Sequence, residues 1–225
     1  MVSLVSTQNE LNMADTELRT YRRDDVISFR KTGETFGGLS NMAPGFPIWI
    51  FERRVRTSEA LYQACRYPHL PAVQRMILNE TSPMTAKMRS KPYREQSRAD
   101  WERVRIPIMK WCLRVKLIYN WQRFSELLLA TGERAIVEDS RKDQFWGAKL
   151  DSNANTLTGQ NVLGRLLMEL REQFRSNPDA LRSIAPVRID MFLLDGRSLP
   201  TIMFSEPSGN EDCANEPQIA QRSFL

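Results

Sequence analysis

The amino-acid sequence predicts a single α+β domain that is mainly α-helical. In one long segment Ile108, Cys112 and Val115 recur at intervals of three or four residues, which is the spacing of an amphipathic helix. Apolar runs at 26–30 and 135–138 predict short strands among the helices. With 225 residues, of which 41% are hydrophobic and 26% charged, the chain has material for one sizeable core.

A glycine-punctuated loop follows the first predicted strand. Gly33 and Gly37 lie on either side of Phe36, and such a loop lets the backbone approach a ligand closely. The apolar and aromatic segment 46–51 predicts a second strand after the loop. Residues 1–20 show no sustained periodicity, so we expect them to form a flexible N-terminal arm.

Residues typical of helix starts predict the helical segments. Thr57 or Ser58 offers an N-cap oxygen, Pro71 suits a first helical position, and Ser82 and Asn161 are caps for two later helices. The predicted helices are a segment from Ser58, a segment from Pro71 that ends before Ser82, 84–89, a long segment from Asp100, 124–129 and 162–174. In the long segment, Pro107 marks either a kink or the true first turn.

The last third of the chain contains two further predictions of irregular and extended structure. Residues 149–160 are rich in Asn, Ser and Gly, so we expect a long polar loop with the candidate role of a lid. Residues 179–184 predict one more helical turn, and 187–194 predict a strand closed by a turn at Asp195-Gly196.

The composition indicates one folded domain at 21–204 between two appendages. The segment 205–225 is polar, carries a net charge of −3 and is expected to be a disordered acidic tail. Because the whole chain carries +5, the remainder carries +8, and arginines outnumber lysines by 25 to 7. Arginine suits bidentate phosphate recognition. A phosphate-bearing partner is one interpretation, and a solvated basic surface is the other.

Several classes of protein are disfavoured by the sequence. No apolar run approaches the roughly 20 residues of a membrane span, and the polar N-terminus lacks the order of a signal peptide, so we expect a cytoplasmic protein without a membrane partner. Cys65, Cys112 and Cys213 are odd in number and far apart, and His69 is the only histidine. We therefore expect neither a disulfide framework nor a metal site, and no cofactor.

Glu59 lies in the first turn of the helix that begins at Ser58. A carboxylate near the positive end of a helix dipole can stay ionised at neutral pH, which suits a catalytic base. From this stretch alone, an ordinary first-turn acid that only complements the dipole is the alternative.

Five spaced motifs occur in one order along the chain. They are Phe36-Gly37 with Leu39-Ser40-Asn41; Ser58 to Ala64; Ser82-Pro83-Met84-Thr85-Ala86-Lys87; Asp143-Gln144-Phe145-Trp146-Gly147; and Asn161 to Arg171. Together they resemble the NADAR (NAD and ADP-ribose associated, or YbiA-like) family over about residues 26–175, and their number and order make the resemblance specific. It implies a YbiA-like fold with a few short strands and a catalytic domain at 21–204.

The resemblance implies an N-glycosidic hydrolase. Glu59-Ala60 and Arg66 stand where many relatives have Glu-His and Lys, and this form looks like the antitoxin branch paired with DarT-type DNA ADP-ribosyltransferases. That branch removes ADP-ribose from guanine in DNA, so the implied partners are ADP-ribosylated DNA and a DarT-type toxin. Two alternatives remain: an N-glycosidase acting on a small phosphorylated riboflavin-pathway intermediate, and a non-enzymatic module that binds ADP-ribose or DNA.

The implied chemistry assigns three candidate catalytic residues. Positive charge builds on the ribose as the glycosidic bond breaks, so a carboxylate that stabilises this charge or deprotonates water is needed, and Glu59 is the first choice. Asp143 is the second carboxylate, with a loop-bracing role as its alternative. Lys87 is either a charge partner for a phosphate or for Glu59, which we favour, or an amine that forms a Schiff base with the opened ribose.

The remaining candidates are substrate-binding residues. Aromatic rings would stack on the base or the adenine, glycines would admit the backbone, and amide or guanidinium groups would bind hydroxyls or phosphates. The aromatic rings are those of Phe36 and Trp146, the glycines are Gly37 and Gly147, and the amide and guanidinium groups belong to Asn41, Asn161 and Arg66.

Overall fold

Six α-helices and a set of short strands make up residues 17–206, the part of the chain that the computed structural model describes. The expected α+β class is confirmed. The helices are α1 (Ser58–Ala64), α2 (Pro71–Leu78), α3 (Pro83–Ser90), α4 (Trp101–Tyr119), α5 (Trp121–Leu129) and α6 (Val162–Ser176). Most of the expected arm and tail, at 1–16 and 207–225, lies outside the described residues.

Local side-chain chemistry sets the helix starts. The Thr57 hydroxyl accepts a hydrogen bond from the Ala60 N–H at 3.3 Å, and the Ser82 hydroxyl accepts one from the Thr85 N–H at 3.4 Å. Each bond satisfies a backbone donor that a helix start leaves free. α4 continues through Pro107, so the boundary at Asp100 is the true start of that helix.

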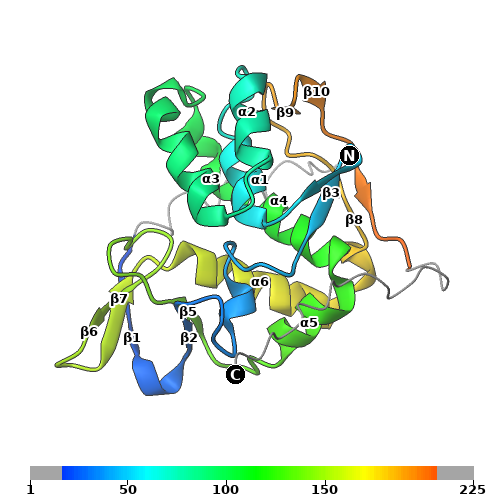
Figure 1. Cartoon of the computed structure of the whole chain (residues 1–225). Coiled ribbons are helices and arrows are strands. Elements are labelled where there is room, and N and C mark those ends of the chain that lie inside the picture. The colour runs from blue at the N-terminus through cyan, green and yellow to red at the C-terminus, as the bar shows by residue number, and fades with distance from the viewer. Residues whose placement is uncertain (1–16, 207–225) are drawn as a thin grey trace, which may run out of the picture.

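The helices pack in two levels. α1 is buried along its whole length and packs against α2, α3 and α4. In Figure 1, α1, α2 and α3 form the upper part of the molecule, and α6 lies below them. α6 packs against α4 and α5 on one side and against the strand β5 (Ile136–Glu138) on another.

The strands are short and form small separate sheets. β2 (Ile27–Phe29) pairs in parallel with β5, and the other strand pairs of the described residues are antiparallel. The expected strands at 26–30, 46–51 and 135–138 are confirmed by β2, β3 and β5. The other strands are β1 (Arg19–Arg22) with β7 (Thr156–Gly159) and β6 (Lys149–Asp151); β3 (Ile48–Ile50) with β4 (Arg53–Val55); β8 (Ser183–Ile184) with β11 (Ile202–Met203); and β9 (Leu193–Leu194) with β10 (Arg197–Ser198).

The expected polar loop at 149–160 is wrong. β6 and β7 form a hairpin there, with Asn155 in a left-handed conformation at its turn, and β7 also pairs with β1. The hairpin is polar because one face is exposed, while Leu157 on the other face is buried. Pairing with β1 also places Arg19 and Thr20 in a strand, inside the segment expected to be an arm.

The expected strand at 187–194 is also mostly wrong. Only Leu193 and Leu194 are extended, in a hairpin whose turn at Asp195 and Gly196 has positive φ angles, as the turn residues predict. Residues 187–192 are irregular, because their apolar side chains, such as buried Phe192, pack directly on the core without a neighbouring strand. The helical turn expected at 179–184 is a short 3₁₀ turn at Asp179–Leu181 followed by β8.

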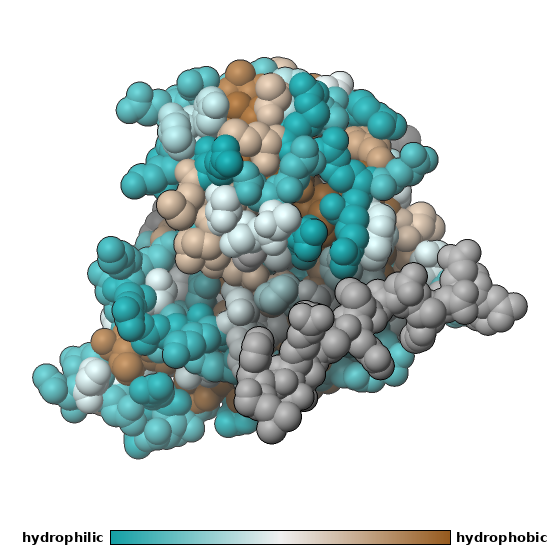
Figure 2. All heavy atoms as spheres, viewed as in Figure 1, coloured by the Kyte–Doolittle hydropathy of each residue, from teal (hydrophilic) through white to brown (hydrophobic). Residues whose placement is uncertain are grey.

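Hydrophilic residues cover most of the face seen in Figure 2, and hydrophobic residues appear there as small separate patches. Within residues 17–206, no helix has both the length and the apolar character needed to cross a membrane.

Candidate active site

A cavity of about 620 Å³ lies between α1, α3, α4 and the segment that follows β5. This volume falls in the range of about 300–1,000 Å³ that small-molecule sites occupy. Its lining combines acidic and basic side chains from all four elements. Six of the ten residues expected in the site contribute to the lining: Glu59, Lys87, Asp143, Asn41, Arg66 and Trp146.

Glu59 occupies the first turn of α1 and is 7% exposed. Its Oε1 accepts a hydrogen bond from the Gln63 side-chain amide at 2.9 Å, one helical turn later. Its backbone N–H donates to the Asn41 carbonyl at 3.0 Å. These two bonds hold the Glu59 carboxyl group in place at the cavity wall.

Asn41 joins the glycine loop to two helices. Its side-chain oxygen accepts a hydrogen bond from the Ser58 hydroxyl at 3.0 Å, and its side-chain nitrogen donates to the Met109 sulfur on α4. Because its carbonyl also receives the Glu59 N–H, Asn41 sets the position of the start of α1. The amide lines the cavity with both of its polar atoms already bonded within the protein.

Asp143 both lines the cavity and braces the loop after β5. Its Oδ1 accepts hydrogen bonds from the backbone N–H groups of Phe145 at 2.9 Å and Trp146 at 3.0 Å, and its own N–H donates to the Ser140 hydroxyl. This is the geometry of the loop-bracing alternative. A direct role toward a substrate remains a prediction.

Glu138, the last residue of β5, is a third cavity carboxylate that sequence reasoning missed. Burial, then the charges of Glu59 and Asp143, raise the pKa of the Glu138 carboxyl to about 7, and the charge of Lys87 opposes this shift. These mutual effects place Glu138 among the three predicted catalytic side chains. The sequence signal was an acid at the end of a predicted strand, but only the fold brings that strand end beside α1.

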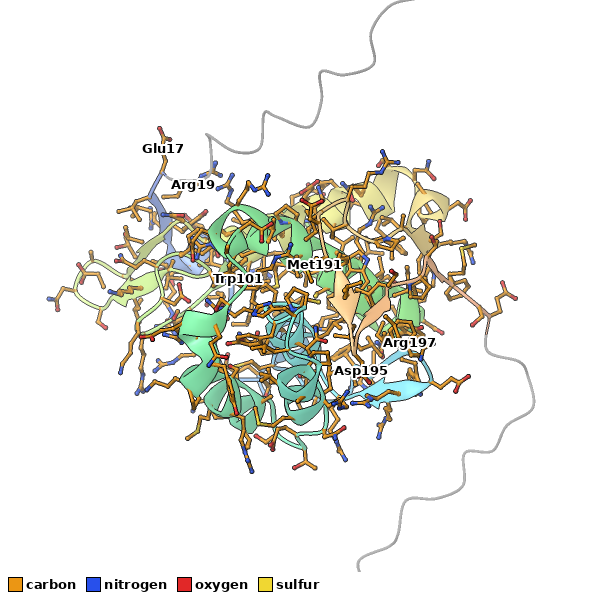
Figure 3. The ribbon with its side chains drawn as sticks, turned by 90° about the horizontal axis from the view of Figure 1, so that it is seen from above. Glu17, Arg19, Trp101, Met191, Asp195 and Arg197 are labelled. Carbon is orange, nitrogen blue, oxygen red and sulfur yellow. The ribbon has the colours of Figure 1, made fainter. Side chains whose placement is uncertain are left out.

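Arginines stacked on aromatic rings form another part of the wall. The Arg66 guanidinium lies 4.6 Å from the centre of the Trp101 ring, and that of Arg105 lies 3.6 Å from the Phe145 ring. In Figure 3, Trp101 lies on α4 where that helix begins. Burial lowers the pKa of Arg66. Among the described residues, the buried Nε atoms of both arginines have no hydrogen-bond partner, and the guanidinium of Arg105 also pairs with Glu102 at 2.9 Å. The two guanidinium groups give this wall positive charge suited to an anion.

Trp146 lines the cavity as part of a packed aromatic cluster. Its ring meets Tyr62 edge to face at 5.6 Å and Phe145 edge to face at 5.0 Å. Tyr62 lies between the acids and the arginines of the wall: burial and then the Glu59 charge raise its pKa well above the usual value, and the charges of Arg66 and Arg105 act in the opposite direction.

Four expected binding residues do not line this cavity. Phe36 lines a second, adjoining one. A side chain on Gly37 would lie 2.4 Å from the Lys31 and Thr32 carbonyl oxygens, and one on Gly147 would lie 2.4 Å from the Glu138 carbonyl oxygen. Both glycines thus admit neighbouring backbone at the position that a side chain would occupy.

Asn161, the fourth, is fully buried and left-handed, with φ of 52°. The expected capping bond to α6 is absent. Instead the side-chain oxygen accepts the Glu138 N–H at 3.1 Å, and the side-chain nitrogen donates to the Ile136 carbonyl at 2.8 Å. Asn161 therefore holds β5 in place. Within residues 17–206, no group of three or more His, Cys, Asp or Glu side chains is arranged to hold a metal ion.

Comparison with known proteins gives a consistent set of relatives. The family model of the NADAR domain matches residues 28–175. N-glycosidase YbiA of Escherichia coli K12 is 33% identical over 151 residues, covering 67% of this chain and 89% of that protein. The NMR structure of E. coli YbiA aligns with a TM-score of 0.58 and 32% identity, covering 69% of this chain and 88% of that one.

A second group of relatives is longer. Riboflavin biosynthesis protein VVA0006 of Vibrio vulnificus is 29% identical over 185 residues, and the match covers 82% of this chain. It covers only 46% of the Vibrio protein, so this chain spans less than half the length of that relative.

Proposed function

Since this chain belongs to the NADAR domain family, whose YbiA members carry the name N-glycosidase, we propose that it hydrolyses the N-glycosidic bond between ADP-ribose and guanine in DNA. In this role it reverses the action of a DarT-type DNA ADP-ribosyltransferase and so acts as its antitoxin. The Glu59-Ala60 pair and Arg66 of the resemblance noted above favour this branch.

The observation that carries the proposal is the division of charge in the cavity. One group comprises the carboxylates Glu59, Glu138 and Asp143 and the ammonium of Lys87, and the other three all interact electrostatically with Glu138. The other comprises Arg66 and Arg105, which are stacked on rings and whose buried Nε atoms have no partner within residues 17–206, with Glu102 paired to Arg105. A substrate with a reacting ribose at one end and phosphate groups at the other, as ADP-ribose has, matches this division.

The two acids of this site take opposite roles in the reaction. Ionised Glu59 stabilises the positive charge that develops on the ribose and takes a proton from the attacking water. Glu138, which is partly protonated at neutral pH, donates its proton to the guanine amine as the bond from the anomeric carbon to nitrogen breaks. Water supplies the hydroxyl of free ADP-ribose, and guanine regains its amino group.

Lys87 is assigned the simpler of its two roles. Its charge lowers the pKa of Glu138, which is what a charge partner of the acid cluster does. In the other route the ribose opens to an imine and the Lys87 amine exchanges onto it. Borohydride added during turnover distinguishes the two: a covalent adduct that disappears in Lys87→Ala would establish the imine route.

A second candidate function is favoured by the names of the relatives. Riboflavin biosynthesis protein VVA0006 and the YbiA N-glycosidases favour a small phosphorylated riboflavin-pathway intermediate as substrate. Such a molecule would use the same acids and would need one arginine-bound phosphate. A non-enzymatic module that binds ADP-ribose or DNA is the third candidate, and it would not depend on the Glu59 carboxylate for its effect.

The decisive experiment follows release of ADP-ribose from a guanine-ADP-ribosylated oligonucleotide by mass spectrometry. We expect release by the wild type, a loss of about 10²–10⁴-fold in kcat in Glu59→Gln, and full activity in Glu95→Gln, an exposed acid outside the cavity. Turnover of the small intermediate without turnover of the oligonucleotide would support the second candidate. If Glu59→Gln protected against the DarT-type toxin as well as the wild type does, the binding module would be supported.

A further inference from the structure

A second cavity of about 490 Å³ opens beside the first. Arg30 and Asp139 line both, so the two cavities are neighbours that share a wall. The second is formed by β2 and the loop that follows it, with one contribution from the start of the chain at Arg23. A ligand in the first cavity that continues beyond the ribose and base can therefore extend into the second.

The second cavity presents three exposed cations. Arg23, Arg30 and Lys31 are exposed, and among the described residues their side chains make no ion pair or hydrogen bond. Glu34 and Asp139 oppose them and leave a net charge of +1. The Glu34 carboxylate accepts the backbone N–H of Arg30 at 2.9 Å, and this bond lowers the pKa of Glu34. The charges of Lys31 and Arg30 lower this pKa further, so Glu34 offsets part of the charge of these two side chains.

Phe36 adds an aromatic surface to these cations. Its ring packs partly on the core and partly faces the cavity. The loop is closed tightly beneath it, because Gly37 lies so near the Lys31 and Thr32 carbonyls that a Cβ would meet them at 2.4 Å. The Phe36-Gly37 motif, which the first cavity does not use, therefore fixes a ring and a lysine on one small loop.

A partly exposed aromatic ring beside exposed cations is the combination with which proteins hold single-stranded nucleic acid, by stacking on a base and binding its phosphates. We propose that the second cavity holds the nucleotide adjacent to the ADP-ribosylated guanine, with its phosphate on Arg23 and Lys31 and its base on Phe36. This rests on the proposed function and extends it, because the preferred substrate becomes a DNA strand rather than a modified mononucleoside.

The test compares two substrates, a guanine-ADP-ribosylated single-stranded oligonucleotide and ADP-ribosylated deoxyguanosine. The double variant Arg23→Ala/Lys31→Ala should raise KM for the oligonucleotide about tenfold or more at low salt, with kcat unchanged, and should leave both parameters unchanged for the nucleoside. Because both side chains hold the same phosphate, the double variant loses one phosphate contact, and the log–log slope of affinity against salt should flatten by about 0.7 on single strands. Phe36→Leu should raise the same KM about five- to 150-fold through lost stacking.

The matched control is Arg54→Ala/Lys91→Ala, which removes the same charge from exposed positions outside both cavities. Equal losses in the control, equal losses on both substrates, or no loss on the oligonucleotide would each overturn the proposal. If the wild type cleaves neither substrate, the proposed function fails. The cavity is then tested by binding of an unmodified single-stranded oligonucleotide, which must weaken in the double variant and not in the control.

Discussion

Glu59 and Glu138 line the same cavity in different surroundings. The amide of Gln63 donates a hydrogen bond to Glu59, whereas burial and two neighbouring acids raise the pKa of Glu138 to about 7. A raised pKa suits Glu138 to the acid role of the proposed mechanism and leaves the base role to Glu59.

This division predicts how kcat depends on pH. Glu138 acts in its protonated form, so kcat should fall as pH rises through about 7, the pKa of that carboxyl. Glu138→Gln has no proton to donate and should lower kcat by about 10²-fold or more, and the fall near neutral pH should disappear. Stopped assays on the oligonucleotide on either side of neutrality measure both effects. If kcat of Glu138→Gln still fell near neutral pH, another group would be responsible for the titration.

Lys116, deep in α4, predicts a pH dependence of stability. It is 1% exposed, and its ammonium donates to the carbonyls of Gly38 at 2.6 Å and Ser40 at 2.9 Å and faces the Phe46 and Phe124 rings. Burial lowers its pKa from 10.5 to about 7. Between these values the unfolded chain binds more protons than the folded one, so the free energy of unfolding should rise with pH.

The slope should reach at most about 1.4 kcal/mol per pH unit, and Lys116→Met should remove it. Urea unfolding of both proteins at several pH values above neutrality measures the difference. Glu138 has the opposite sign, because its raised pKa makes the folded state bind more protons between the ordinary value and about 7. That window lies below neutrality, so the two contributions can be separated. A slope that persists in Lys116→Met would contradict the assignment.

The candidate site was partly predictable at the residue scale. Glu59, Asp143 and Lys87 lie in recognisable motifs, and the fold brings all three to one cavity. Glu138 was not predictable, because its acidity depends on β5 ending beside α1, which no local pattern encodes. Asn161 was placed correctly at a helix start but given the wrong partner, since its hydrogen bonds reach 25 residues back to Ile136.

At the scale of elements, β5 is held by close backbone approaches. A Cβ on Gly164 would lie 2.1 Å from the Ile136 carbonyl oxygen, so α6 can approach β5 only where it carries glycine. Likewise, a Cβ on Gly147 would lie 2.4 Å from the Glu138 carbonyl oxygen, so the segment whose Ala148 N–H donates to that carbonyl also needs glycine there. Motif residues expected to contact the substrate thus build the frame that positions the end of β5.

This frame predicts the effect of Asn161→Ala. The change leaves the buried Ile136 carbonyl and Glu138 N–H without partners and puts alanine at a positive φ. We expect the free energy of unfolding to fall by about 2–5 kcal/mol, measured by urea denaturation. Asn153→Ala, at an exposed position on the β6–β7 hairpin, should change it by less than about 0.5 kcal/mol. Similar values for the two variants would refute the framing role.

Elements were predictable where side chains a few residues apart define them. The Thr57 and Ser82 caps and Pro71 each lie within four residues of the turn they start. The β6–β7 hairpin was missed because its strands are polar on their exposed face and because its third strand pairs Arg19 with Gly159, far along the chain. Only tertiary pairing makes that segment extended.

For the whole molecule, the central cavity joins a chemical centre to an anion-binding wall. In the proposed complex, the acids at the end of β5 and the start of α1 would face the ribose, and the arginines between α1 and α4 would face the phosphates. If ADP-ribose is the group held, binding should not need the base or the DNA. The product itself is then a ligand whose affinity depends on Arg66 and Arg105.

ADP-ribose should therefore stabilise the folded wild type and raise its unfolding temperature. At a concentration a hundred times Kd, the free energy of unfolding should rise by about 2.7 kcal/mol. Arg66→Ala or Arg105→Ala should shrink this increase, because each removes a guanidinium whose buried Nε has no partner among the described residues. Arg103→Ala, on the same helix but outside the cavity, should retain it. Ribose 5-phosphate is the competing probe. A larger stabilisation by ribose 5-phosphate than by ADP-ribose would favour a small phosphorylated substrate. The reason is that a site for a single phosphate gains nothing from the second phosphate and the adenosine.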